Sequence, residues 1–101
     1  MLLVFSDPGC HPCNRVAQEL ERIHRRSEGL QVLMVSRGDR VANEEKATQY
    51  GLTFPIVLQR HWEISRAYAL FATPVGYLID EDGVISSSAA VGADPILNLA
   101  C

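Results

Sequence analysis

Two cysteines three residues apart, Cys10 and Cys13, are the pair in this sequence whose spacing most clearly allows chemistry. They follow a short apolar run and the turn cluster "SDPG" (residues 6–9), and they open an amphipathic segment. A cysteine at such a strand-to-helix turn lies where helix N–H groups point outward, which favours the thiolate over the thiol. The second cysteine lies one turn along the same face, within disulfide reach. We therefore expect Cys10 to be the attacking thiol and Cys13 the more buried, resolving thiol.

The two residues between the cysteines support this reading. Pro12 suits the first position of a helix and keeps the loop short. His11, when protonated, would lower the pKa of the neighbouring Cys10 thiol. A CxxC pair at a strand–helix junction in a βαβ pattern is typical of a redox motif.

Metal chemistry is the main alternative for the pair. A structural zinc site needs four ligands, but a second cysteine pair is absent and His24, His61 and Cys101 are scattered along the chain. Covalent haem attachment requires a histidine directly after the second cysteine, where this chain has Asn14. A copper site made by the pair and a distant histidine stays open. We expect no metal and no cofactor, and we expect His24 and His61 to be packing or capping residues.

The bulk properties describe one globular domain over residues 1–101, with 48% hydrophobic and 21% charged residues. A net charge of −3 gives no basic surface for nucleic acid or an anionic membrane. The apolar runs have strand length, so no segment is expected to span a bilayer, and no signal peptide is visible. The chain starts on a strand and stops at Cys101 as a last helix begins, which is consistent with a piece of a longer exported or membrane-tethered protein. Cys101 itself is either an exposed thiol able to link dimers in vitro or a buried residue of that helix.

Hydrophobic periodicity and turn signals predict the element order β-α-β-α-β-α-β-β-(α). Alternation in the first half implies parallel strands with right-handed crossovers, and a terminal hairpin adds antiparallel strands. Asp39 and Gly51 are the expected caps of the second helix, and Gly29 closes the first. The charged run at residues 39–46 ("DRVANEEK") is expected to be a solvated face. The predicted strands are residues 2–5, 30–36, 54–59, 75–79 and 84–87, and the predicted helices are 12–26, 39–50, 62–71 and a last one with Asp94 as N-cap and Pro95 first.

Two longer segments resemble a known family. "VFSDPGCHPC" (residues 4–13) and "FATPVGYLIDEDGVI" (residues 71–85) are similar to the thioredoxin superfamily, and within it to the TlpA/ResA-like and MauD-like redoxins. The resemblance implies an α/β thioredoxin-like fold: a central mixed sheet of four to five strands flanked by helices, with a C-terminal β-hairpin. It also implies that Pro74 follows a cis peptide bond beside the cysteine pair, and that Thr73 presents backbone groups to an extended substrate strand.

The sequence departs from ordinary thioredoxins at three places. The tryptophan usual before the first cysteine is Gly9, and the buried acid usual six residues before that cysteine is Val4. Proton transfer to and from Cys13 then needs another route. His-Pro replaces the ordinary Gly-Pro between the cysteines, and a histidine there should raise the reduction potential above that of thioredoxin, about −270 mV.

These features favour a thiol–disulfide oxidoreductase that acts on disulfides or dithiols of partner proteins and draws electrons from an upstream donor. The resemblance implies an extracytoplasmic setting, with the cytoplasm as the alternative. Separately, we expect a monomer, without nucleic-acid or membrane contact within this chain. One alternative function is a thiol peroxidase, although Asp7 stands where such enzymes carry threonine and no arginine can be placed nearby. The other is a non-catalytic thioredoxin-like metallochaperone. The direction of electron flow stays open.

Overall fold

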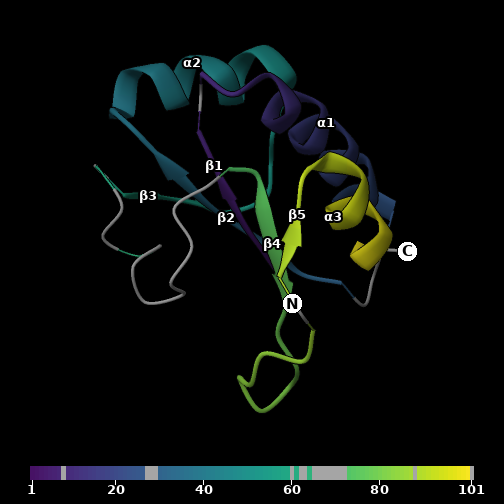
Figure 1. Ribbon diagram of the computed structural model, residues 1–101. Coiled ribbons are helices and arrows are strands. Elements are labelled where there is room, and N and C mark those ends of the chain that lie inside the picture. Colours follow the sequence, from purple (N-terminus) through teal and green to yellow (C-terminus); the bar gives the residue numbers. More distant parts are fainter. Residues whose placement is uncertain are drawn as a thin grey trace.

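A five-stranded mixed sheet forms the centre of the protein (Figure 1). The computed structural model describes residues 1–7, 9–26, 30–59, 61, 64, 73–87 and 89–100. The sheet order is β3-β2-β1-β4-β5; the first three strands are parallel, and β4 and β5 are antiparallel to their neighbours. The predicted α/β class with a mixed sheet is confirmed. The strands are β1 (Leu2–Ser6), β2 (Val32–Arg37), β3 (Ile56–Gln59), β4 (Val75–Leu78) and β5 (Ala90–Val91).

Three helices cover one face of this sheet: α1 (His11–Arg26), α2 (Arg40–Tyr50) and α3 (Ala93–Ala100) (Figure 1). Because β1, β2 and β3 are parallel and successive in the sheet, right-handed crossovers place both α1 and α2 on the same side. The core between helices and sheet is apolar and well buried. Its buried members are Leu2, Val4, Val16, Ala17, Leu20, Val32, Met34, Phe54, Ala90 and Ile96.

The other face of the sheet carries a second apolar cluster. Phe5 and Tyr77 meet edge to face there, with their ring centroids 6.3 Å apart. Ile64 packs against this cluster. The predicted helix at residues 62–71 falls almost entirely outside the described residues and stays a prediction, as do the cap at Gly29 and both readings of Cys101. The buried members of the cluster are Leu3, Phe5, Val35, Val75 and Tyr77.

The predicted caps of α2 are confirmed. The Asp39 carboxylate accepts a hydrogen bond from the Ala42 N–H at 2.7 Å. Gly51 adopts the left-handed conformation (φ 63°), and its N–H donates to the carbonyls of Ala47 and Thr48. Each group satisfies backbone atoms that the helix leaves unpaired at its ends.

The terminal hairpin forms its turn as predicted, but its return strand differs. The Gly83 N–H donates to the Asp80 carbonyl at 3.0 Å. The predicted strand at residues 84–87 is reduced to one bridge, between Ile79 and Ile85. The physical reason is a side-chain bond. The Ser87 hydroxyl oxygen accepts a hydrogen bond from the Leu78 N–H at 3.0 Å, in the place where a strand partner would offer its backbone carbonyl.

The strand that completes the edge of the sheet is β5, which the sequence did not indicate. It pairs Val91 with Val75 and Ala90 with Gly76. The last helix also begins earlier than predicted. Its first residue is Ala93, and the Ile96 N–H donates to the Gly92 carbonyl at 3.3 Å, so Asp94 and Pro95 lie inside the first turn.

Within the described residues, no helix has both the length and the apolar character needed to cross a membrane.

Candidate active site

The turn between β1 and α1 is held by Asp7. Its carboxylate Oδ1 accepts a hydrogen bond from the Gly9 N–H at 2.9 Å, and its backbone carbonyl accepts one from the Cys10 N–H at 3.1 Å. A bond from an aspartate side chain to the N–H two residues later is a common way to stabilise a turn. Asp7 therefore determines where the chain places Cys10, directly before the first residue of α1.

Cys10 and Cys13 form a disulfide, with their Cα atoms 5.2 Å apart. The Cys13 N–H also donates to the Cys10 Sγ at 3.2 Å, so the sulfur lies at the amino-terminal end of α1. Cys13 is completely buried, whereas Cys10 is partly exposed. A donor and a helix dipole aimed at one sulfur favour negative charge on that sulfur once the disulfide is reduced.

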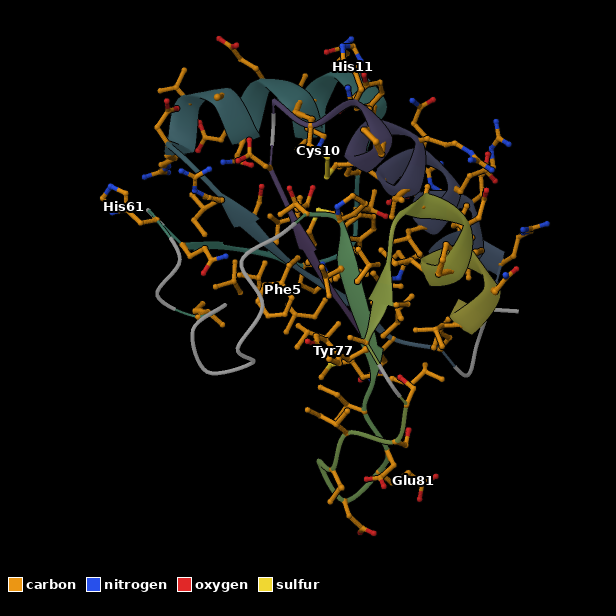
Figure 2. All side chains as sticks on the ribbon, in the orientation of Figure 1. Phe5, Cys10, His11, His61, Tyr77 and Glu81 are labelled. Atoms are coloured by element: carbon orange, nitrogen blue, oxygen red, sulfur yellow. A yellow bond between two sulfur atoms is a disulfide. The ribbon has the colours of Figure 1, made fainter. Side chains whose placement is uncertain are left out.

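His11 and Pro12 are both exposed in the first turn of α1. Figure 2 shows the labelled Cys10 and His11 together at one end of the molecule, above the sheet. The helix starts one residue before the predicted position, at His11, and Pro12 is its second residue. Neither position requires a backbone N–H donor within the helix, so proline is compatible with the observed start.

Pro74 reaches the same end of the sheet from β4. The Thr73–Pro74 peptide bond is cis, as the resemblance implied. The register pairs Phe5 with Val75, so one step further along the strands Pro74 stands opposite Ser6, at the strand end that leads into the cysteine turn. Pro74 is buried, and its carbonyl accepts a hydrogen bond from the Gly92 N–H at 3.0 Å. The register therefore places Pro74 at the end of β1 that leads into the turn of Cys10.

Two cations, Arg37 and Lys46, accompany Asp7, and the sequence analysis missed both. Arg37, at the end of β2, places Nη1 3.1 Å from the Asp7 Oδ2, with side chains 35% and 25% exposed respectively. Lys46, on α2, is buried at 8% exposure. Burial lowers the pKa of Lys46, and the Asp7 carboxylate partly offsets that effect. An arginine can therefore be placed beside Asp7, contrary to the expectation from sequence.

The run at residues 39–46 was wrongly expected to be entirely solvated, because Asn43 and Lys46 are both buried. A usable signal existed: α2 has few apolar residues, and Val41, its largest aliphatic one, is 64% exposed. Polar side chains must then face the sheet. Asn43 does so in a bond with Ser36, which donates its hydroxyl hydrogen to the Asn43 Oδ1.

The remaining histidines do not join the cysteines. His24 packs edge to face on Phe54, with ring centroids 6.1 Å apart, and lines an apolar cavity of about 470 Å³ beside Met1 and Pro55. His61 lies at the left edge of the view in Figure 2, apart from Cys10 near the top. In the part of the chain that the structure describes, no three His, Cys, Asp or Glu side chains are grouped to hold a metal.

Known proteins are similar to this chain in sequence and in fold. The thiol-disulfide oxidoreductase ResA of Geobacillus thermodenitrificans is 36% identical over 89 residues, covering 84% of this chain and 51% of the relative. The chain therefore spans about half the length of the relatives it matches.

Two solved structures superpose closely. StoA of Bacillus subtilis matches with a TM-score of 0.82 at 23% identity, over 98% of this chain and 78% of that one. A secreted disulfide oxidoreductase of Mycobacterium tuberculosis, homologous to E. coli DsbE, matches with a TM-score of 0.77 at 17% identity, over 96% and 79%. These likenesses establish the thioredoxin-like fold that the sequence predicted.

A family profile covers most of the sequence and the whole of the cysteine turn and β4. It matches residues 1–88 and describes the AhpC/TSA family. With that match, the chain belongs to the AhpC/TSA family, within which it is a TlpA/ResA-like redoxin domain.

Proposed function

We propose that the protein is a thiol–disulfide oxidoreductase whose working groups are Cys10 and Cys13. The observation that carries the proposal is their disulfide at the start of α1, between one partly exposed and one fully buried sulfur. The ResA relatives, which are thiol-disulfide oxidoreductases, support it. An accessible sulfur can be attacked or can attack, while the buried one is protected from outside thiols.

The reduced protein transfers two electrons to a partner disulfide in two steps. The Cys10 thiolate attacks one partner sulfur, which forms a mixed disulfide and releases the other partner sulfur as a thiolate. Cys13 then loses its proton and attacks the Cys10 sulfur. That step forms the Cys10–Cys13 disulfide and releases the second partner sulfur, and the two partner thiolates take up protons according to pH. The reverse sequence oxidises a partner dithiol.

Supporting roles fall to the four neighbours of the pair. His11 and Pro12 occupy the exposed first turn of α1, where a protonated imidazole favours the Cys10 thiolate. Thr73, which precedes the cis peptide bond, offers backbone groups to an extended segment of the partner, and Pro74 fixes that bond across from the end of β1. This last role follows the family resemblance.

The natural substrates are disulfides or dithiols of proteins outside the cytoplasm, with an upstream dithiol donor. The secreted oxidoreductase of M. tuberculosis with the same fold supports that setting. We propose that residues 1–101 act as one domain, as a monomer, within a longer exported or membrane-tethered protein.

Redox equilibration against glutathione buffers, followed by thiol trapping and intact mass measurement, tests this function. We expect one reversible two-electron transition, abolished in Cys10→Ser and in Cys13→Ser. The matched control is Cys101→Ser, which removes the third thiol and should leave the transition unchanged. If the wild-type protein forms no Cys10–Cys13 disulfide at any ratio of oxidised to reduced glutathione, the proposal is wrong. Peroxide consumption coupled to a reductant would then favour the peroxidase alternative.

A further inference from the structure

Lys46 is a buried cation that the proposed chemistry has not used. It is the only lysine of the sequence, it is 8% exposed, and its Nζ has no hydrogen-bond partner among the described residues. A buried ammonium without a partner destabilises a fold, because the charge loses its hydration without compensation. Its presence here therefore calls for a role other than stability.

Lys46 is buried on α2, one turn beyond the residue that fastens this helix to the end of β2. One turn earlier on α2, Asn43 binds Ser36 and donates to the carbonyls of Arg37 and Asp39, at 3.3 and 2.8 Å. These bonds fix α2 over the carboxyl end of β2, beside the end of β1 where Asp7 begins the turn. The carboxylate of Asp7, the residue that holds Cys10, raises the pKa of Lys46 against the lowering caused by burial.

The charges of Asp7, Arg37 and Lys46 together give a net positive charge. Asp7 alone would oppose a thiolate at Cys10, because two like charges would lie near each other. Arg37 and Lys46 bring two positive charges against that one carboxylate. Arg37 is one-third exposed and is screened by water and salt, whereas the charge of Lys46 is buried and is screened much less.

Among the described residues, the other charged groups of α2 and of the start of α1 lie in solvent. Arg40, Glu44 and Glu45 are on the exposed side of α2, and His11 is exposed at the start of α1. Val4, inside β1, is fully buried and carries no charge. Within the described part of the chain, Lys46 is thus the buried charged group of α2 whose charge can offset that of Asp7.

We propose that Lys46 is a positioning residue of the dithiol site that offsets the Asp7 carboxylate and shifts the Cys10–Cys13 equilibrium toward the dithiol. The inference rests on the proposed function. Reduction of the disulfide takes two electrons from a partner dithiol and one proton, and it yields a Cys10 thiolate and a Cys13 thiol. A positive charge nearby stabilises that thiolate but has no effect on the neutral disulfide, so it raises the reduction potential.

The coupling between the Cys10 thiolate and the Lys46 ammonium can also be measured at Lys46. If the ammonium favours the thiolate, the thiolate must favour the ammonium by the same free energy. Reduction of the wild-type protein should therefore raise the pKa of Lys46. Because the chain has one lysine, isotope-labelled lysine gives a single side-chain signal whose titration can be followed by NMR in the oxidised and reduced states.

The deciding experiment compares glutathione equilibria of the wild type with Lys46→Met, Lys46→Arg and Asp7→Asn. Lys46→Met should lower the equilibrium constant for dithiol formation about tenfold, equal to about 30 mV. Lys46→Arg should retain the wild-type value, and Asp7→Asn, which keeps an oxygen for the Gly9 N–H, should move the constant in the opposite direction. The matched control Arg40→Gln removes a positive charge from the exposed side of the same helix and should cause no shift.

The outcomes separate two failures. If the wild type shows no reversible dithiol couple, the proposed function itself fails. If the couple exists but Lys46→Met leaves its midpoint unchanged, or the Lys46 titration is the same in both redox states, the role of Lys46 is refuted.

Discussion

Two buried ionisable side chains, Glu21 and Lys46, lie on the same side of the sheet but differ in their hydrogen bonding. Glu21, on α1, accepts hydrogen bonds from the Thr53 N–H and the Thr53 hydroxyl, both at 2.6 Å, and from Arg25 at 2.5 Å. Lys46, on α2, has no such bond among the described residues. Burial alone would raise the pKa of Glu21, but the bonds from Thr53 and Arg25 outweigh it and lower that pKa to about 2.

The difference separates a structural charge from a functional one. Glu21 joins α1 to the segment before β3, and every bond it makes favours the folded state. Lys46 lies beside the cysteine turn, where an uncompensated charge costs stability but can act on a thiolate. We therefore interpret Glu21, whose bonds are complete, as a group that holds the fold, and Lys46, whose amine has no bond to the described residues, as a group available to chemistry.

The largest effect is expected from Glu21→Gln. At pH 7 the variant should lose about 2 kcal/mol of unfolding free energy, because the bonds to Thr53 are no longer made to a charged acceptor. Its reduction potential should stay at the wild-type value. The control is Glu19→Gln, whose carboxylate pairs with Arg22 at 3.0 Å on the surface and should contribute less than about 0.5 kcal/mol.

The pH dependence of that loss follows from the direction of the pKa shift. Glu21 binds its proton less readily in the folded state (about 2) than at its ordinary value of 4.5. Its contribution is therefore complete above pH 4.5 and disappears as the pH falls through 2. Urea titrations of both proteins should converge over this range, and an undiminished difference at pH 2 would contradict the assignment.

Lys46→Met should have a smaller effect of opposite sign. Removing an unpaired buried charge should stabilise the oxidised protein by about 1 kcal/mol at pH 7. Since the pKa of Lys46 is lowered in the folded state, the unfolded chain binds more protons, and wild-type stability should rise toward that of the variant as the pH approaches 10.5. A variant less stable than the wild type would show that Lys46 has a structural partner and would remove the contrast with Glu21.

The smallest effect is expected from His11→Gln. This variant compares the influence of the exposed His11 on the dithiol equilibrium with that of the buried Lys46. At pH 6 the variant should show an equilibrium constant for dithiol formation about threefold lower, equal to about 15 mV, because solvent screens a charge on the surface of α1. Glutathione equilibration measures this shift. A change larger than that of Lys46→Met would mean that the exposed residue between the cysteines, rather than the buried amine, determines the potential.

The parts of the fold that sequence could predict are those governed by local rules. The strand–turn–helix around Cys10, the caps at Asp39 and Gly51 and the Asp80–Gly83 turn each follow from nearby residues. β5 could not be predicted, because two residues gain a strand conformation only from pairing with β4.

The residues of the site likewise fall into those that local sequence could predict and those that it could not. The cysteine pair and the cis bond before Pro74 were identified from motifs. Arg37 and Lys46 were missed because their proximity to Asp7 depends on how β2 and α2 pack beside β1, which no spacing in the sequence records. The motif reveals the sulfur chemistry, and tertiary structure supplies the charges around it.

The position of β5 affects how the domain can be shortened. Ala90 and Val91 lie beyond residue 88, where the family match ends, yet they cover the outer side of β4, and Gly92 binds the Pro74 carbonyl. A chain trimmed to the matched segment would leave β4 as an edge strand with open N–H and C=O groups, a template for pairing with a second molecule. Ala90, Val91 and Gly92 thus occupy the β4 backbone groups next to the cis-proline that would otherwise be open to another strand.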